Sequence, residues 1–172
     1  MHTGKGQVLE LVLEDGHRHV RVSCPTALLP GPGQYLLVSG ESVSPLPIPL
    51  FYTDSAAGGF IAAVPTSVSW RPGLSLSLRG PLGHGFTLPL AARRVGLVAF
   101  DDHPARLRGL IRPALRQDAD VVLVCGAVPD TLPDDVEVQP LSALSEVVDW
   151  ADYMAFDVSR ENLTQLREQV AK

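Results

Sequence analysis

Apolar and polar residues alternate in short stretches over the first 80 residues of the chain. Alternation with a period of two predicts β-strands with one buried face, and Gly, Pro and Asp residues separate the stretches at intervals of roughly ten residues. Asp15-Gly16 lies between the first two stretches and is a strong signal for a tight hairpin. We expect six antiparallel strands, at residues 7–13, 18–23, 34–39, 48–53, 60–64 and 74–78. Such a series is typical of a small barrel or sandwich.

The pattern changes after Phe86, where continuous apolar runs alternate with helical spacing. A run that is apolar throughout predicts a strand buried on both faces, as in a parallel sheet. A helix beginning at Pro104 is expected, and a final helix that Ser159 can cap. The buried stripe of the first helix should consist of Leu107, Leu110, Ile111, Ala114 and Leu115. The strands are expected at residues 94–100, 120–125, 136–139 and 152–157.

Together these elements predict a two-domain β + α/β protein. Residues 1–88 are expected to form a six-stranded antiparallel barrel, and residues 89–172 a reduced Rossmann-like parallel sheet. The stretch Gly80-Pro81-Leu82-Gly83-His84-Gly85-Phe86 lies at their junction. Its three glycines allow a sharp change of direction, and Pro81 is expected to stiffen the exit from the last barrel strand. We interpret this stretch as a corner between the two domains.

Composition and charge argue against several classes of function. The chain has 172 residues, of which 45% are hydrophobic, and this is enough for a buried core. Its longest apolar runs fall far short of the ~20 residues of a membrane span, so we expect no membrane association and a cytoplasmic location. Residues 1–90 carry five basic and five acidic side chains, and residues 91–172 carry nine and fourteen. No cluster of basic residues is large enough to bind a nucleic acid, so we expect no nucleic acid as a partner.

The two cysteines, Cys24 and Cys125, are isolated in the sequence. Without paired spacing they predict neither a disulfide framework nor a cysteine-ligated metal or iron–sulfur site within the chain. Cys125 follows four apolar residues and is expected to be a buried thiol at the end of a strand. Trp70 and Trp150 are interpreted as core or interface anchors rather than as a stack for a cofactor.

Two groups of polar residues suggest chemistry, and each also has a simpler structural explanation. His17 and His19 lie beside the hairpin turn and could ligate a metal. No carboxylate or cysteine with ligand spacing joins them, so we interpret both as solvated turn residues and predict no metal site. Asp101-Asp102-His103 could act as an acid–base group or could cap an exposed helix start, and we favour the cap.

Three short motifs occur in the order found in a known family. Pro32-Gly33-Gln34-Tyr35 resembles a P-G-Q-[FY] strand, Arg71-Pro72-Gly73 lies where a P-G-D precedes the last barrel strand, and residues 80–86 resemble a G-P-L-G-N-G-F corner. With a barrel followed by an α/β sheet, these motifs make the chain similar to the ferredoxin–NADP reductase superfamily. It most resembles the electron-transfer subunit of dihydroorotate dehydrogenase. The resemblance implies a flavin on the barrel and a nicotinamide cofactor on the second domain.

The resemblance places contacts to FAD on the barrel wall and at the corner. The family motif R-P-I-S-I aligns with residues 46–50, where Leu46 replaces the phosphate-binding arginine and Pro49 replaces the serine. An arginine donates two parallel hydrogen bonds to a phosphate, and neither replacement can supply them. His84 either faces a ligand or hydrogen-bonds across the corner, as the family's asparagine could. The implied cofactor-binding positions are Pro47, Ile48, Leu50, Tyr52, Gly83 and His84.

The nicotinamide motif is also changed. The family's G-G-G-x-G turn corresponds to residues 99–104, which hold two aspartates and no glycine. Glycines let a pyrophosphate approach the backbone at a helix start, whereas carboxylates repel it. The family's C-G-P-x-x-M-L is replaced by residues 156–163, and the carboxy-terminal cysteines that bind a [2Fe-2S] cluster have no counterpart. We therefore expect no NAD(P) binding and no iron–sulfur cluster, while FAD binding stays open.

These observations support three functional hypotheses and leave open whether the chain is catalytic. The first is an accessory or structural subunit of a redox complex, with its own flavin and nicotinamide sites eroded. The alternative is an active FAD-containing oxidoreductase subunit that passes electrons between a dehydrogenase partner and an acceptor. The third is a module that binds a small ligand in the cleft between the domains. The partner is expected to be a protein subunit of a redox complex or a second copy of the chain. The interface is expected to include Leu28, Leu29, Leu36 and Leu46.

Overall fold

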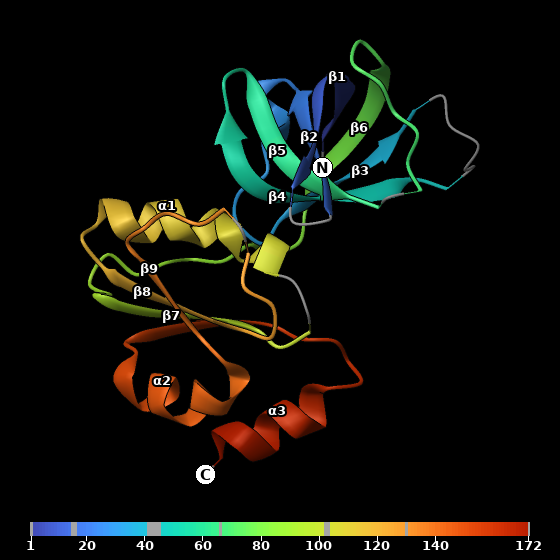
Figure 1. Cartoon of the computed structure of the whole chain (residues 1–172). Coiled ribbons are helices and arrows are strands. Elements are labelled where there is room, and N and C mark those ends of the chain that lie inside the picture. Colours follow the sequence, from blue (N-terminus) through green and yellow to red (C-terminus); the bar gives the residue numbers. More distant parts are fainter. Residues whose placement is uncertain are drawn as a thin grey trace. The chain divides into compact units, whose positions relative to one another are not determined.

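The computed structural model describes residues 2–14, 17–40, 46–65, 67–101, 104–129 and 131–171. The chain divides into two compact units, Met1–Phe86 and Thr87–Lys172. In Figure 1 the first unit runs from blue to green and the second from yellow-green to red. Among the described residues, no helix combines the length and the apolar character that crossing a membrane requires.

The first unit is a closed antiparallel barrel of six strands, which pair in the order β1-β2-β5-β4-β3-β6 (Figure 1). This confirms the predicted six-stranded barrel. The strands are β1 (His2–Glu14), β2 (His17–Ser23), β3 (Tyr35–Ser39), β4 (Ile48–Ala56), β5 (Gly59–Val64) and β6 (Ser75–Leu82), and a 3-10 helix, η1 (Thr26–Leu28), follows β2. The barrel core consists of Val8, Val20, Val22, Leu28, Leu36, Val38, Leu50, Phe60, Ala62, Val64, Val68, Trp70, Leu76 and Leu78. The expected role of Trp70 as a core residue is confirmed.

The consecutive strands β1 and β2, β3 and β4, and β4 and β5 pair antiparallel in the barrel. β1 and β2 form the predicted first hairpin, in which Glu14 lies opposite His17. The turn residues Asp15-Gly16 lie outside the described residues. In the hairpin of β4 and β5, Ala56 lies opposite Gly59, so the connection has two residues and is shorter than the turn predicted there.

β1 begins at His2, well before residue 7, where alternation predicted its start. The inward positions of this additional segment hold Gly4 and Gly6, which give no hydrophobic signal. A Cβ at Gly4 would lie 2.7 Å from Cδ1 of Leu28. Glycine therefore leaves the space that η1 fills, and the sequence pattern misses the strand for the same reason.

β6 also runs further than predicted and ends at Leu82, so Gly80 and Pro81 belong to the strand. Pro81 therefore lies in the second-last position of the strand rather than after it, and its stiffening of the strand's exit stays a prediction. Gly80 has a φ of +155°, and a Cβ there would lie 2.6 Å from Cδ2 of Leu36. Only glycine can adopt this positive φ and also leave room for the Leu36 side chain. Residues 83–86, which follow β6, are the stretch named the corner above, and they belong to the first unit.

The leucines expected at an interface fall into two groups. Leu28 and Leu36 are 1% and 0% exposed and belong to the barrel core, so the expectation is wrong for both. Leu29 and Leu46 are 38% and 73% exposed. Leu28 is buried because η1 turns it into the barrel, and Leu36 because it occupies an inward position of β3.

The second unit is a parallel sheet of four strands in the order β10-β7-β8-β9, as predicted for a reduced Rossmann-like sheet. Helix α1 lies on one face, and α2 and α3 lie on the other (Figure 1). The strands are β7 (Arg94–Ala99), β8 (Asp120–Cys125), β9 (Val136–Gln139) and β10 (Tyr153–Asp157). The helices are α1 (Arg108–Arg116), α2 (Leu144–Trp150) and α3 (Leu163–Val170), with 3-10 turns η2 (Pro104–Arg106) and η3 (Leu141–Ala143).

The helices differ in part from the sequence-based expectations. The segment from Pro104 forms η2 first and becomes α-helical only at Arg108. Four of the five residues expected in the stripe are buried, while Leu115 is only half-buried. Helix α2 was not predicted, because it has seven residues and buries only Leu144 and Val147. The predicted anchor Trp150 packs at its end against the core on this face of the sheet.

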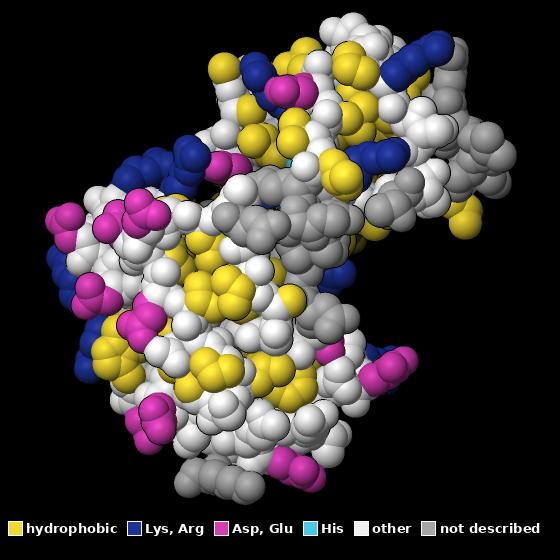
Figure 2. Space-filling model, in the orientation of Figure 1, with side chains coloured by type: hydrophobic (Ala, Val, Ile, Leu, Met, Phe, Trp, Pro, Cys, Tyr) yellow, Lys and Arg dark blue, Asp and Glu magenta, His cyan; other side chains and the backbone are white. Residues whose placement is uncertain are grey.

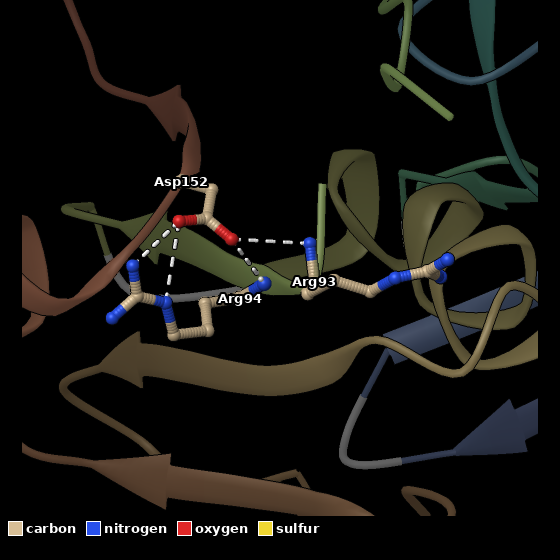
Figure 3. A network of polar contacts seen from close by, with 3 residues as sticks. All are labelled: Arg93, Arg94 and Asp152. Atoms are coloured by element: carbon tan, nitrogen blue, oxygen red, sulfur yellow. Dashed lines mark hydrogen bonds and ion pairs between the residues drawn. The ribbon is translucent and has the colours of Figure 1, made fainter. Parts of the chain in front are cut away.

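One carboxylate joins the amino ends of β7 and β10 (Figure 3). Asp152 Oδ2 accepts hydrogen bonds from the backbone N–H groups of Arg93 and Arg94, at 3.1 Å each. Its Oδ1 accepts from Nε and Nη2 of Arg94, at 3.2 and 2.7 Å. The bond from the Arg94 side chain is the largest cause that holds the pKa of Asp152 below its ordinary value. This clamp fixes the end of the sheet that lies opposite the strands' carboxyl ends.

Candidate functional site

The strand order of the second unit creates a switch point between β7 and β10. From β7 the chain adds β8 and β9 on one side, and then crosses to add β10 on the other. In open parallel sheets, ligands bind outside the carboxyl ends of the strands at such a point. Here these ends are Ala99 and Asp157, which pair with each other. The residues that follow them are therefore the first candidates for a binding site.

Asp101, two residues after β7, links the two strand ends. Its carboxylate accepts hydrogen bonds from the backbone N–H of Ser159 and from the side-chain amide of Asn162. These bonds, the one from Asn162 first, hold the pKa of Asp101 below its ordinary value. The predicted helix cap is therefore wrong for Asp101, since its carboxylate is bonded to the segment that precedes α3. Asp102 and His103 lie outside the described residues.

Ser159 does not cap the last helix as predicted. Helix α3 begins at Leu163, and Asn162 occupies the position before it. The Ser159 hydroxyl accepts a long hydrogen bond, 3.4 Å, from the backbone N–H of Asn162. Both residues are therefore held within a turn that Asp101 binds, so their polar groups serve this link rather than a ligand.

A second carboxylate and an arginine complete this cluster. Arg106 Nη1 lies 3.1 Å from Asp157 Oδ1, and the Asp157 side chain is 19% exposed. Burial raises the pKa of Asp157, and Arg106 offsets part of this effect. Asp101 adds a like charge nearby, which also raises the pKa of Asp157.

This cluster does not fit the pyrophosphate of a nicotinamide dinucleotide. Two carboxylates stand at the switch point, and Arg106 already pairs with one of them. A pyrophosphate needs backbone N–H groups and cations at such a place. The second unit as a whole is acidic, since residues 91–172 carry nine basic and fourteen acidic side chains, and Figure 2 shows acidic side chains spread over it in magenta.

Three of the positions expected to bind FAD lie on β4 and face the interior of the barrel. Leu50 is fully buried, and Ile48 and Tyr52 pack against the same core. Successive side chains of a strand point to opposite faces, so these three share the inner face. Leu50 can offer only backbone groups to a ligand outside, while Ile48 and Tyr52 are partly exposed. Pro47, directly before β4, is exposed.

The outward positions of β4 and β3 were not identified from the sequence. Pro49 is exposed and lies opposite Leu37, while Phe51 lies opposite Tyr35. The rings of Tyr35 and Phe51 have centroids 5.1 Å apart and planes tilted by 40°. The alternation of inward and outward residues along β3 and β4 could have revealed this aromatic pair, because its neighbours Leu36 and Leu50 are clearly inward residues. The pair offers a ring surface on the barrel wall, and Pro49 offers no N–H beside it.

The corner contains the last two expected FAD positions, Gly83 and His84, and both are exposed. The Gly83 carbonyl accepts a hydrogen bond of 3.2 Å from the Gln34 side chain. The same side chain accepts one of 3.0 Å from the backbone N–H of Gly31 through its Oε1. Gln34 therefore fixes the corner to the loop before β3.

The two motifs that carry the family resemblance contact each other. The backbone N–H of Phe86 donates a hydrogen bond of 2.8 Å to the Pro32 carbonyl. Gly33 has a φ of +77°, and a Cβ there would lie 2.6 Å from Cδ2 of Phe86. The Phe86 ring thus covers Gly33, and both motifs have a structural role that needs no cofactor.

The remaining polar candidates do not form a catalytic group. His19 is buried on β2, so the expectation of a solvated turn residue is wrong for it, and the His17 side chain lies outside the described ones. Burial raises the pKa of the Cys24 and Cys125 thiols, which disfavours the reactive thiolate. Cys125 is the buried strand-end thiol that was predicted. Within the described part of the chain, no three His, Cys, Asp or Glu side chains could hold a metal ion together.

Comparison with known proteins identifies the architecture. Neither a family model nor a curated protein matches the sequence. Among solved structures, the ferredoxin reductase of carbazole 1,9a-dioxygenase matches with a TM-score of 0.71 and 17% identity, over 99% of this chain and 65% of that one. Phthalate dioxygenase reductase matches with a TM-score of 0.68 and 12% identity, over 98% and 64%. Ferredoxin-NADP+ reductase from Plasmodium falciparum matches with a TM-score of 0.73 and 6% identity, over 98% and 92%.

The chain has the ferredoxin reductase fold. Its barrel and its four-stranded parallel sheet correspond to the two domains of this fold. The chain spans about two thirds of the length of the carbazole and phthalate dioxygenase reductases that it matches. The ferredoxin reductase fold thus extends over almost the whole chain. At sequence identities of 6–17%, the side chains at the binding sites need not be the same as in these proteins.

Proposed function

We propose that the chain is a ferredoxin-reductase-like electron-transfer component that serves as an accessory or structural subunit of a redox complex, with its own nicotinamide and flavin sites eroded. The observation that carries this proposal is the position of Asp101. Its carboxylate is bonded to Ser159 and Asn162 at the switch point of the sheet, where a dinucleotide would need donors for its pyrophosphate.

The barrel wall supports the same proposal for the flavin. By the family resemblance to the electron-transfer subunit of dihydroorotate dehydrogenase, an arginine should stand at Leu46 and a serine at Pro49. Leu46 is 73% exposed and apolar, and Pro49 has neither a hydroxyl nor an N–H. The described residues of this wall therefore do not fit the phosphate-binding half of a flavin nucleotide.

The fold relatives suggest the kind of partner. Phthalate dioxygenase reductase is described as a modular structure for electron transfer from pyridine nucleotides to [2Fe-2S]. For this chain we propose a protein subunit of a redox complex as the partner, or a second copy of the chain. We propose no nucleic acid, no membrane and no iron–sulfur cluster, and a cytoplasmic location, on the grounds of charge, apolar-run length and cysteine spacing given above.

An absorbance and binding experiment tests the erosion of both sites. The purified full chain is expected to show no flavin band near ~450 nm, either as isolated or after incubation with FAD and gel filtration. Thermal shift with NADH and NADPH is expected to show no concentration-dependent stabilisation. A stoichiometric flavin band, or a saturable shift with either nucleotide, would overturn the proposal. Light scattering after gel filtration distinguishes a monomer from a homodimer.

A second candidate function is an active FAD-containing oxidoreductase subunit. The aromatic pair Tyr35 and Phe51 favours it, because ring faces on a barrel wall can stack on an isoalloxazine. The expected positions Ile48, Leu50 and Tyr52 would then contribute backbone groups, and Pro47, Gly83 and His84 exposed surface. Added FAD should in that case lose fluorescence on binding, and Phe51→Ala should weaken the quenching while Leu9→Ala, at an exposed site on β1, should not.

A further inference from the structure

A groove of about 310 Å³ lies between the edge strand β9 and helix α2 of the second unit. Its inner side is apolar, because Val122 of β8 and Val147 of α2 belong to the core on this face of the sheet. An apolar inner side with a few polar groups around it is typical of a binding site. The groove is also lined by Glu137, Gln139, Glu146 and Trp150.

Strand register and helix spacing bring these side chains to one groove. Glu137 pairs with Val122 in neighbouring parallel strands, so both side chains point to the face that α2 covers. Glu146 and Trp150 are four residues apart on α2, which makes them neighbours on one side of the helix. The groove is thus bounded by a carboxylate from the strand, and by a carboxylate and an indole from the helix.

Both carboxylates keep their charge available to a ligand. Glu137 accepts a hydrogen bond from the side-chain amide of Gln139, a neutral donor that leaves the negative charge in place. Glu137 and Glu146 are exposed, and neither forms an ion pair with another residue that the structure describes. No Lys, Arg or His lines the groove in the described part of the chain. The groove therefore prefers a cation.

The lining residues suit an organic cation better than a metal ion. Among the described residues, no further His, Cys, Asp or Glu joins the two glutamates to hold a metal. A guanidinium group can use the glutamates and the indole together, because its planar edge donates paired hydrogen bonds to a carboxylate and its face stacks on an aromatic ring. Tryptophan is the aromatic residue that attracts such a cation most strongly. An ammonium group has neither the flat face nor the paired donors.

The edge of the sheet indicates that the guanidinium group belongs to a polypeptide. Within the described residues β9 pairs only with β8, so its outer backbone groups can receive another strand. Neighbouring strands lie about 4.8 Å apart. A side chain opposite Glu137 on an added strand would therefore lie beside Glu137 on the face that α2 covers, where the groove is. The acidic character of residues 91–172 favours a basic partner at this edge.

We propose that a strand of a protein partner pairs with β9 and places an arginine side chain in this groove. The arginine pairs with Glu137 and Glu146, and its guanidinium plane stacks on Trp150. This inference rests on the proposed function only for the kind of partner, a protein subunit of a redox complex. The flavin and nucleotide experiments above do not involve the groove, so the two proposals fail by different results.

NMR spectra of the ¹⁵N-labelled full chain test the site with the blocked peptide acetyl-Gly-Thr-Arg-Thr-Gly-amide. The amides of Glu137, Val138 and Gln139 and the indole N–H of Trp150 are expected to shift in a saturable way, with half-saturation below about 20 mM. The chain has two tryptophans, and Trp150→Phe identifies the indole signal. The same peptide with citrulline in place of arginine carries a neutral urea group of nearly the same shape and should shift none of these signals.

Two further ligands separate the parts of the proposal. The peptide with lysine in place of arginine should bind severalfold more weakly, and equal binding would show that the guanidinium group is not what the groove recognises. Propylguanidine carries the side chain without a backbone and should also bind severalfold more weakly, because it cannot pair with β9. If propylguanidine binds as tightly as the peptide, the groove takes a small free cation and the strand of the proposal is wrong.

Matched charge variants locate the binding. The double variant Glu137→Gln/Glu146→Gln is expected to weaken peptide binding at least about fivefold, since two charge-assisted hydrogen bonds become neutral ones. Glu168→Gln removes a single charge from an exposed position on α3 outside the groove and should change the affinity less than about twofold. Should the double variant not fold, Glu146→Gln alone, at an exposed side chain, still has to weaken binding more than Glu168→Gln does.

Four results overturn the proposal. The first is no shift in any groove residue at about 20 mM peptide. The second is a set of shifts confined to residues 1–86, which would place the peptide in the other unit. The third is an equal affinity in the double variant and in Glu168→Gln. The fourth is a concentration-dependent shift of the β9 amides without peptide, which would show that a second copy of the chain occupies this edge.

Discussion

The contact between Gly33 and Phe86 predicts a specific loss of stability when Gly33 is replaced by alanine. The new Cβ would lie 2.6 and 2.9 Å from Cδ2 and Cε2 of Phe86, so the ring has to move. The φ of +77° at this position adds a conformational cost of roughly 1–2 kcal/mol for a residue with a side chain. Overpacking adds roughly 1–3 kcal/mol. We expect Gly33→Ala to lower the free energy of unfolding of the barrel by about 2–5 kcal/mol.

Gly58 provides a matched control. Its φ is +72°, and a Cβ there would meet no atom within 4 Å. Gly58→Ala therefore carries the conformational cost without the clash, roughly 1–2 kcal/mol. The difference between the two variants, about 1–3 kcal/mol, measures the packing of Phe86 on Gly33.

Urea unfolding followed by tryptophan fluorescence measures these effects for the barrel alone. The chain has two tryptophans, Trp70 in the barrel core and Trp150 in the second unit. In a Trp150→Phe background, the emission reports only the first unit. This separation is needed because a chain with two units does not have a single free energy of unfolding.

The reasoning fails if Gly33→Ala and Gly58→Ala destabilise the barrel equally. A double-variant cycle gives a stricter test. With Phe86→Ala the ring is absent, so adding Gly33→Ala should cost no more than Gly58→Ala does. A larger cost in that background would show that the clash is not with Phe86.

Three further predictions concern the carboxylate cluster and the barrel wall. Asp101→Asn is expected to lower the urea midpoint of the second unit near pH 7. Because the folded pKa of Asp101 is depressed, its charged form stabilises the fold above the unfolded pKa. The difference in midpoint between the parent protein and the variant should shrink as the pH falls through the folded pKa. Asp157→Asn is expected to leave this midpoint unchanged or raise it near pH 7, since a raised folded pKa means that the charged form opposes folding, and the difference should vanish below the unfolded pKa. A midpoint shift of the opposite sign in either variant, read from Trp150 emission in a Trp70→Phe background, would contradict the assignment of these carboxylates. Leu50→Ala is expected to cost the barrel roughly 2–5 kcal/mol and Pro49→Ala no more than about 1 kcal/mol, because only Leu50 is inside; equal losses in urea unfolding would refute the assigned faces.

The sequence predicts the strands well wherever apolar residues mark the inner face. β8 and β9 have the predicted bounds, because each is flanked by turn residues and is largely apolar or alternating. The start of β1 could not be predicted, since Gly4 and Gly6 occupy its inner face without a hydrophobic signal. Helix α2 is too short for a periodic pattern to stand out.

The candidate sites were harder to predict because they depend on pairs that are distant in the sequence. Asp101 binds residues 58 and 61 positions away, and only the parallel pairing of β7 and β10 brings them together. The helix cap was the best local explanation for a carboxylate before a helix, and the tertiary contact replaced it. The outer aromatic pair could have been predicted, since alternation along β3 and β4 already assigns Tyr35 and Phe51 to one face.

Closure of the barrel and the open form of the sheet give the two units different risks of aggregation. In the barrel every strand has two partners, so no row of backbone groups is available to another chain. The parallel sheet ends in β9 and β10, and β10 brings Tyr153, Met154 and Phe156 to its edge. On heating or dilution from denaturant, strand pairing between molecules should therefore begin in the second unit. Solubility screens and chaperone dependence should follow changes in β10 and not changes in the barrel.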